Sequence, residues 1–207
     1  MGQPLRKSTP AFTYADYCAW PEDERWELIN GEAYAMAAPN RVHQTTVGEL
    51  FRQIANYLIE KPCRPFIAPF DVRLPEGQEA DDQVTTVVQP DISVICDPDK
   101  LDERGCRGAP DWVIEVLSPG TAARDQIEKR DVYERAGVGE FWLVHPTDHV
   151  VTIYTLDAER RYGKPAIHAT TGQLVSGLFP ELQIDWALVF PDALVQSSPS
   201  PAGRSGA

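Results

Sequence analysis

Two carboxylates in strongly apolar segments are the residues of this sequence whose positions point most directly to chemistry. Glu115 stands in the middle of Trp112–Leu117, and strand alternation puts apolar side chains on either side of it on its own face. Asp91 stands between the apolar runs 87–88 and 92–95, after a proline that removes one backbone donor. A carboxylate among apolar side chains loses hydration energy unless a cation meets it. We therefore expect each of them to bind a metal ion or to pair with a lysine.

Lys129 is the cation that the sequence offers for this pairing. We expect a helix over residues 122–136, and on a helical wheel Lys129 falls on a partly apolar arc with Val132 and Tyr133. It therefore does not belong to the charged face of that helix. Because the helix begins only a few residues after the strand of Glu115, a short connection lets Lys129 reach the Glu115 carboxylate.

Two carboxylates and a lysine are the side chains that metal-dependent phosphodiester hydrolysis requires. Carboxylate oxygens bind hard cations such as Mg²⁺ or Mn²⁺. Such a cation polarises a phosphate and lowers the pKa of a bound water, and an ammonium group can position that water or stabilise developing charge. We accordingly predict Asp91, Glu115 and Lys129 as catalytic residues, with Asp91 and Glu115 as ligands of Mg²⁺ or Mn²⁺.

Each of these three residues also has a structural interpretation. Asp91 fits a turn residue after a proline. Glu115 fits a buried ion pair, for which Arg73 is a candidate partner. Lys129 fits an i, i+4 pair with Asp125 on the surface of the helix. We favour the functional interpretation because the three residues occur together.

Glu32 and Asp125 are additional candidates for the site. Glu32 follows the turn of a predicted hairpin and is either a third metal ligand or simply a residue that flanks the turn. Asp125 is better suited to tune Lys129 or the start of the helix than to bind metal. His43 begins an amphipathic helix, where it is either a cap or surface residue or a member of the site.

The elements that must hold these residues follow an α/β pattern. Asn30-Gly31 predicts an N-terminal β-hairpin over 26–36, since both residues tolerate positive φ. Apolar residues at three- and four-residue steps predict an amphipathic helix over 42–59. The order of these elements predicts a mixed β-sheet flanked by α-helices. We further expect a short helix at 14–20, a loop over 97–110, and strands at 66–74, 84–88, 92–96, 112–117, 141–144, 150–156 and 182–184.

A longer set of residues carries a resemblance to a known family. In chain order it comprises Glu27–Glu32, Phe70–Leu74, Pro90-Asp91, Glu115–Pro119, Asp125, Lys129, Tyr133 and Gly137–Trp142. This set resembles the Uma-two family of restriction endonucleases, assigned to the PD-(D/E)XK nuclease superfamily, from about residue 12 to residue 190. The resemblance implies a restriction-endonuclease-like fold. The superfamily places a lysine where this chain has Leu117, and the resemblance implies that the lysine has moved to Lys129.

These observations together predict a Mg²⁺-dependent endodeoxyribonuclease, a hydrolase that cleaves the phosphodiester bonds of DNA. Two alternatives stay open: a binding or regulatory module on the nuclease fold with little or no cleavage activity, and a small-molecule hydrolase on the same metal site. The net charge of −12 favours the module, because proteins that grip nucleic acid usually carry a basic footprint. The expected partner is DNA, and a homodimer is a further expectation because restriction enzymes often act as dimers.

Length and composition predict one domain over residues 13–190, with a flexible arm at 1–12 and a disordered tail at 191–207. The sequence contains no pattern typical of a signal peptide and no apolar run long enough to span a membrane, so the expected location is cytoplasmic. The four cysteines lack metal-site spacing, and we expect free thiols in that compartment.

Overall fold

The computed structural model describes residues 11–21, 23–118 and 125–191. Most of the predicted arm and tail therefore lies outside the described residues. Within the arm, the backbone N–H of Phe12 donates to the carbonyl of Gly31 at 2.9 Å, so this residue is attached to the domain. Of the tail only Pro191 is described, and the expected disorder stays a prediction.

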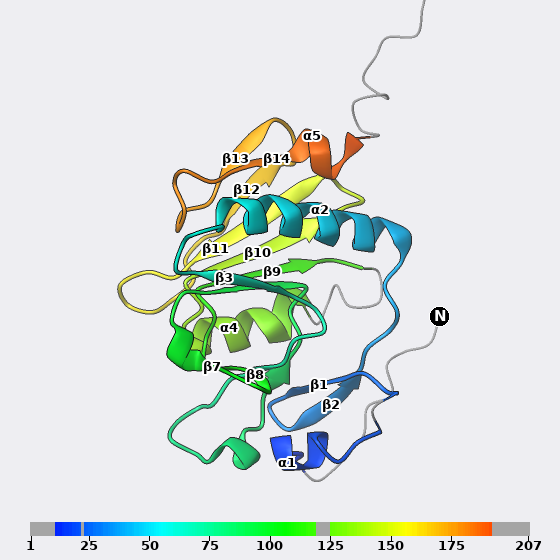
Figure 1. Cartoon of the computed structure of the whole chain (residues 1–207), viewed down its shortest axis with the longest axis vertical. Helices are drawn as coiled ribbons and strands as arrows, with labels where there is room; N and C mark the ends of the chain where they lie inside the picture. The colour runs from blue at the N-terminus through cyan, green and yellow to red at the C-terminus, as the bar shows by residue number, and fades with distance from the viewer. Residues whose placement is uncertain (1–10, 22, 119–124, 192–207) are drawn as a thin grey trace, which may run out of the picture.

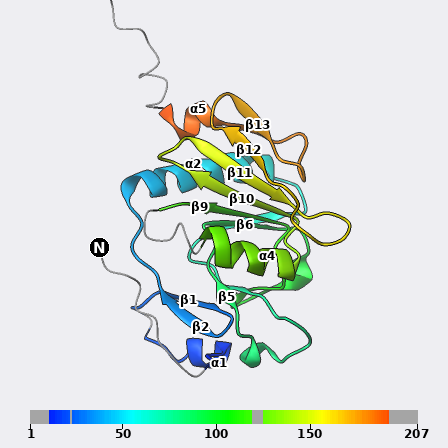
Figure 2. The same cartoon turned by 180° about the vertical axis from the view of Figure 1, so that it is seen from behind.

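Six strands form the central sheet, with α2 (Arg41–Tyr57) on one face and α4 (Arg130–Ala136) on the other (Figures 1 and 2). Strands β9 and β10 are parallel, and the other neighbours are antiparallel. The predicted mixed sheet flanked by helices is confirmed. The spatial order is β12 (Ala166–Ala169), β11 (Val150–Thr155), β10 (Glu140–His145), β9 (Trp112–Val116), β6 (Ile92–Ile95) and β3 (Arg64–Ile67).

Strand β9 is central and buried on both faces, as its composition, apolar except for Glu115, indicates. All five of its residues are buried. Ile114 belongs to the core on the α2 side, where it packs in one cluster with Leu50. Val113 belongs to the opposite core, together with Val132 of α4. Glu115 has the same parity as Val113, so its side chain belongs to the α4 side of the sheet.

A second six-stranded sheet lies beyond α4, below the central sheet in Figure 1. The core around α4 joins the two sheets, since it contains Ile29, Val72 and Cys106 from the second sheet beside Val113 and Phe141 from the central one. Short α1 (Tyr14–Tyr17) packs on its outer side. The spatial order is β2 (Glu32–Ala35), β1 (Trp26–Ile29), β5 (Val87–Val88), β4 (Val72–Arg73), β8 (Gly105–Arg107) and β7 (Leu101–Asp102).

The predicted N-terminal hairpin is present as β1 and β2. Its two turn residues, Asn30 and Gly31, have φ values of 50° and 77°, the left-handed backbone that this turn requires. Glu27 pairs with Tyr34 and Ile29 pairs with Glu32 across the hairpin. Because directly opposed residues share a face, these four side chains lie on the face of the second sheet that carries Ile29 into the α4 core.

The division of the strands into two sheets was not predicted from the sequence. The expected loop over 97–110 contains β7 and β8, and the single strand expected over 66–74 ends at Ile67 and resumes as β4. Strands of two or three residues are too short for alternation to be visible, so only pairing across the sheet defines them. The remaining described elements are η1 (Asp81–Gln83), η2 (Pro98–Lys100), η3 (Asp125–Lys129), β13 (Gln173–Val175), β14 (Gln183–Asp185) and α5 (Trp186–Val189).

The helix predicted over 122–136 is described from residue 125 onward and changes its winding at Lys129. Residues 125–129 form a π-helical turn, and α4 continues the segment to Ala136. Gly137 ends α4 with φ 94°, the left-handed conformation expected of a helix-closing glycine. Single π-helical turns are frequent at functional sites, and this one ends on the predicted catalytic lysine.

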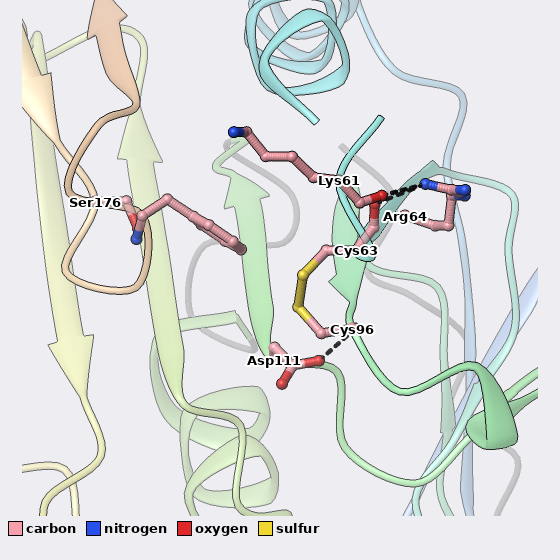
Figure 3. Close-up of a disulfide and its surroundings, with 7 residues drawn as sticks. Lys61, Cys63, Arg64, Cys96, Asp111 and Ser176 are labelled. Carbon is pink, nitrogen blue, oxygen red and sulfur yellow. Dashed lines mark hydrogen bonds between the residues drawn. A yellow bond between two sulfur atoms is a disulfide. The ribbon is translucent and has the colours of Figure 1, made fainter. Parts of the chain in front are cut away.

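Two cysteines form a disulfide, so the expectation of four free thiols was wrong. Cys63 and Cys96 are bonded, and Figure 3 shows the bridge between their two chain segments. The register of β3 and β6 pairs Arg64 with Ile95, which sets the two cysteines opposite each other one step beyond the strands. The spacing of Cys63 and Cys96 in the sequence does not indicate that they lie next to each other in the fold. Cys18 and Cys106 are free thiols.

None of the helices described in these residue ranges combines the length and the hydropathy that crossing a bilayer demands. The cytoplasmic location stays a prediction.

Candidate active site

Glu115 receives two hydrogen bonds at one carboxylate oxygen. Its Oε1 accepts from Lys129 Nζ at 2.8 Å and from the Tyr133 hydroxyl at 2.7 Å. The exposed fractions of the three residues are 3% for Glu115, 2% for Lys129 and 0% for Tyr133. Lys129 and Tyr133 are four residues apart across the junction of η3 and α4, so one helical face presents both to the strand. The contact between Lys129 and Glu115 that the sequence predicts is therefore present.

Lys129 lies between two buried carboxylates, of which the sequence predicted only Glu115 as its partner. Its Nζ is 2.8 Å from Glu115 Oε1 and also 2.8 Å from Glu27 Oε1. Glu27 comes from β1 in the second sheet and is 0% exposed. The side chain of Lys129 therefore lies where the central sheet, the second sheet and the η3–α4 helix meet.

Glu27 was missed although its sequence carries the same signal as Glu115. It is a carboxylate within the apolar run Trp26–Ile29, with Ile29 on its own face. The backbone N–H of Gln89 donates to Glu27 Oε1 at 2.9 Å. The sequence predicted Glu32, which flanks the hairpin turn, and not Glu27 as a member of the site.

Asp91 lies beside Glu115 where β6 begins and β9 ends, and we call this margin of strand ends the edge of the central sheet. Ile92 pairs with Ile114, and continuing this antiparallel register by one step brings Asp91 alongside Glu115. The backbone N–H of Val116 donates to Asp91 Oδ2 at 2.7 Å. The side chain of Asp91 is thereby held against the strand that carries Glu115.

His43 also contacts Asp91, which gives this histidine a place next to the site. Its Nε2 is 3.1 Å from Asp91 Oδ2, and the two side chains are 12% and 17% exposed. His43 lies in the first turn of α2, where its backbone N–H donates to the Asn40 cap at 2.9 Å. The N-terminus of α2 thus reaches the same edge of the sheet as Asp91.

The two additional candidates, Glu32 and Asp125, lie at the start of β2 and at the start of η3. Glu32 Oε2 accepts a hydrogen bond from the Tyr34 hydroxyl at 2.9 Å, and it shares the hairpin face that carries Glu27. Asp125 begins η3, but its side chain is outside the described part of the structure. The proposed roles of both residues stay predictions.

Arg73, the alternative partner considered for Glu115, is engaged elsewhere. Its two terminal nitrogens lie 2.6 Å from carboxylate oxygens of Asp81 and Asp102. The Arg73 guanidinium holds the pKa of Asp102 below its ordinary value through this hydrogen bond. Arg73 of β4 therefore forms ion pairs with η1 and with β7 and does not neutralise Glu115.

A second polar network supports the segment that leads to Asp91. The Gln89 side chain donates to the Tyr17 hydroxyl at 3.0 Å and to Asp71 at 2.9 Å, and it accepts from Arg25 at 2.8 Å. Burial, and then the charge of Asp71, raises the pKa of Tyr17, so its hydroxyl remains a donor to that carboxylate. Gln89 is held by its side chain while its backbone N–H binds Glu27.

The donor set at this edge of the sheet suits a hard divalent cation. Asp91 and Glu115 offer carboxylate oxygens only, and Mg²⁺ is commonly held by one or two carboxylates with waters and substrate phosphate completing its shell. Over residues 11–21, 23–118 and 125–191, no cluster of three or more His, Cys, Asp or Glu side chains is arranged to hold a metal ion. Carboxylate oxygens are the ligands that hard divalent cations such as Mg²⁺ and Mn²⁺ prefer.

Comparison with known proteins agrees with this architecture. A crystal structure described as "a putative nuclease belonging to DUF820 from Anabaena variabilis" has the same fold, with a TM-score of 0.69 at 20% identity over 87% of this chain and 98% of that one. "Uncharacterized protein slr1290" of Synechocystis is 29% identical over 148 residues, which are 70% of this chain and 74% of that protein. The Uma2 family model, described as "Putative restriction endonuclease", matches residues 14–187. Since this match spans most of the chain, the protein belongs to the Uma2 family.

Proposed function

We propose that this protein is a metal-dependent endodeoxyribonuclease that hydrolyses phosphodiester bonds of DNA. The observation that carries the proposal is the buried contact of 2.8 Å between Lys129 Nζ and Glu115 Oε1, beside an Asp91 carboxylate bonded to the backbone of Val116. These three residues come from β9, from the position that precedes β6 and from the η3–α4 helix. The Uma2 family description and the nuclease named in the structural comparison agree with this chemistry.

Asp91 and Glu115 are the residues that would hold Mg²⁺ or Mn²⁺. A divalent cation bound there supplies polarisation of the scissile phosphate and compensates the negative charge that develops during hydrolysis. The protein contributes fixed positions: Val116 N–H holds Asp91 at 2.7 Å, and the Tyr133 hydroxyl holds Glu115 at 2.7 Å. Preformed positions of this kind lower the reorganisation that the reaction requires.

Lys129 supplies the permanent positive charge of the proposed site. Its ammonium lies 2.8 Å from Glu115 Oε1, and the two side chains form a buried ion pair. The hydrogen-bond donors of this ammonium would orient the attacking water or bind an oxygen of a substrate phosphate held by the metal. Lys129 would in this way take the role of the lysine that the superfamily pattern places where this chain has Leu117.

The proposal is tested by cleavage of supercoiled and single-stranded DNA in Mg²⁺ or Mn²⁺. Asp91→Asn and Glu115→Gln should each lower kcat by on the order of 100-fold while circular dichroism stays that of the wild type. Glu140→Gln is the matched control, because Glu140 is also buried but belongs to the opposite face of the sheet with Trp142. Absence of cleavage by the wild type, together with absence of Mn²⁺ binding in calorimetry, would reject the proposal.

A binding or regulatory module with the nuclease fold is the second candidate. The net charge of −12 favours it, because a phosphate backbone is repelled by an acidic surface. The two candidates differ in one measurement: with Mn²⁺ at saturation the nuclease cleaves supercoiled DNA, whereas the module leaves it intact. A homodimer, which would bring two sites to the two strands, stays a prediction.

A further inference from the structure

We infer that Glu27 is a positioning residue of the nuclease site, which holds the Lys129 ammonium against Glu115 and ties it to the segment leading into Asp91. The inference rests on the proposed nuclease function for its kinetic consequence. It assigns a role to a residue of the second sheet, away from the strands that carry the predicted metal ligands. Two contacts of this buried carboxylate, with Lys129 and with Gln89, and its place in the fold support the inference.

The first contact is the ion pair with Lys129. Glu27 Oε1 and Glu115 Oε1 are each 2.8 Å from Lys129 Nζ, so the ammonium is held from two sides. A lysine has four rotatable side-chain bonds, and one carboxylate alone leaves its end free to pivot. Two carboxylates from different sheets define a single position for Nζ.

The second contact joins Glu27 to the chain ahead of Asp91. Gln89 donates its backbone N–H to the same Glu27 oxygen at 2.9 Å. Only Pro90 separates Gln89 from Asp91, and its ring restricts the backbone between them. One oxygen atom of Glu27 therefore receives hydrogen bonds from both Lys129 and the segment that sets the direction of Asp91.

The third consideration is the place of Glu27 in the fold. It lies on β1, with Tyr34 as its cross-strand partner, and is fully buried where the second sheet meets α4. A buried ion pair is weak evidence for stability, because an apolar pair of similar volume often serves the core equally well. The arrangement is explained if the N-terminal hairpin serves to fix the lysine of a site built on the other sheet.

Kinetics of Glu27→Gln test this role, since the glutamine keeps the shape and an acceptor oxygen but removes the charge. We expect kcat to fall by about 10- to 100-fold with KM and the Mn²⁺ dissociation constant unchanged within about twofold. Glu140→Gln, the same substitution at a buried glutamate of the opposite face, should leave all three values unchanged. A kcat of Glu27→Gln equal to that of the wild type would overturn the inference. A tenfold weaker Mn²⁺ affinity would also overturn it, because Glu27 would then be a ligand.

A spectroscopic arm separates this inference from the proposed nuclease function. With ¹⁵N-labelled lysine, a buried ammonium gives a slowly exchanging Nζ–H signal, which Lys129→Met assigns by its absence. We expect the signal in the wild type and in Glu140→Gln, and its loss in Glu27→Gln through exchange at least about tenfold faster. This readout holds even if the wild type cleaves no DNA. An unchanged signal in Glu27→Gln would overturn the positioning role. If Glu27→Gln does not fold, Glu27→Asp, which is one methylene shorter, is measured in the same two assays.

Discussion

Replacing Lys129 with methionine should destabilise the fold strongly, because it removes the cation that two buried carboxylates share. Glu27 and Glu115 are 0% and 3% exposed, and each has an oxygen 2.8 Å from Lys129 Nζ. Methionine matches the four-atom apolar stem of the lysine and lacks the terminal nitrogen, so the packing change is small. Breaking a buried pair by removal of one partner costs about 3–5 kcal/mol. Since two carboxylates lose the cation here, we expect the free energy of unfolding to fall by the upper part of that range.

Urea unfolding followed by tryptophan fluorescence measures this loss, since the chain has five tryptophans. The midpoint should fall with an unchanged slope, which indicates lower stability rather than a changed unfolded state. The double variant Lys129→Met/Glu27→Gln should recover part of the loss, with a coupling free energy between about 0.5 and 3 kcal/mol. A loss below about 1 kcal/mol in Lys129→Met, or strict additivity in the double variant, would refute the argument that this ammonium compensates two carboxylates.

Two further predictions concern the thiols and one buried carboxyl group. Ellman titration in denaturant should count two thiols without reductant and four with it, and four thiols without reductant would contradict the bridge. The double variant Cys63→Ser/Cys96→Ser should lose about 2–4 kcal/mol of stability. In the native protein at pH 8 an alkylating reagent should modify exposed Cys18 and spare Cys106, whose pKa burial raises to about 12, and equal labelling of both would contradict this. Burial also raises the pKa of Glu140, so folding favours its protonated form. This contribution is present below the unfolded pKa and is lost as pH rises through the folded one. The stability of the wild type relative to Glu140→Gln should therefore decline as pH rises from the ordinary titration range of a glutamate, and a difference independent of pH would argue against it.

The sequence determined the features that depend on neighbouring residues. Asn30-Gly31 predicted the hairpin because the turn requires left-handed backbone at both positions, and both have it. The spacing of apolar residues predicted α2 because a helix repeats every 3.6 residues. The unbroken apolar run around Glu115 predicted a strand covered on both faces. Each of these inferences reads a local backbone preference or a period within one element.

The sequence predicted one contact within the candidate site, between two residues that lie close in the chain. Glu115 and Lys129 are separated by a short connection, and their contact followed from strand parity and helical phase. His43 and Asp91 lie on a helix and a strand far apart in the sequence, and their contact at 3.1 Å depends on where the N-terminus of α2 meets the sheet. Their functional roles stay predictions until the variants are assayed.

Only the tertiary structure decided which distant residues meet. It divided the strands into two sheets, paired Cys63 with Cys96, and brought Glu27 from the first hairpin to Lys129. These outcomes depend on strand pairing and on the packing of α4 between two sheets, which hundreds of weak contacts determine together. A single sequence reveals that a carboxylate is buried, because its neighbours are apolar. It does not reveal which cation the fold brings to that carboxylate, because the partner comes from another element.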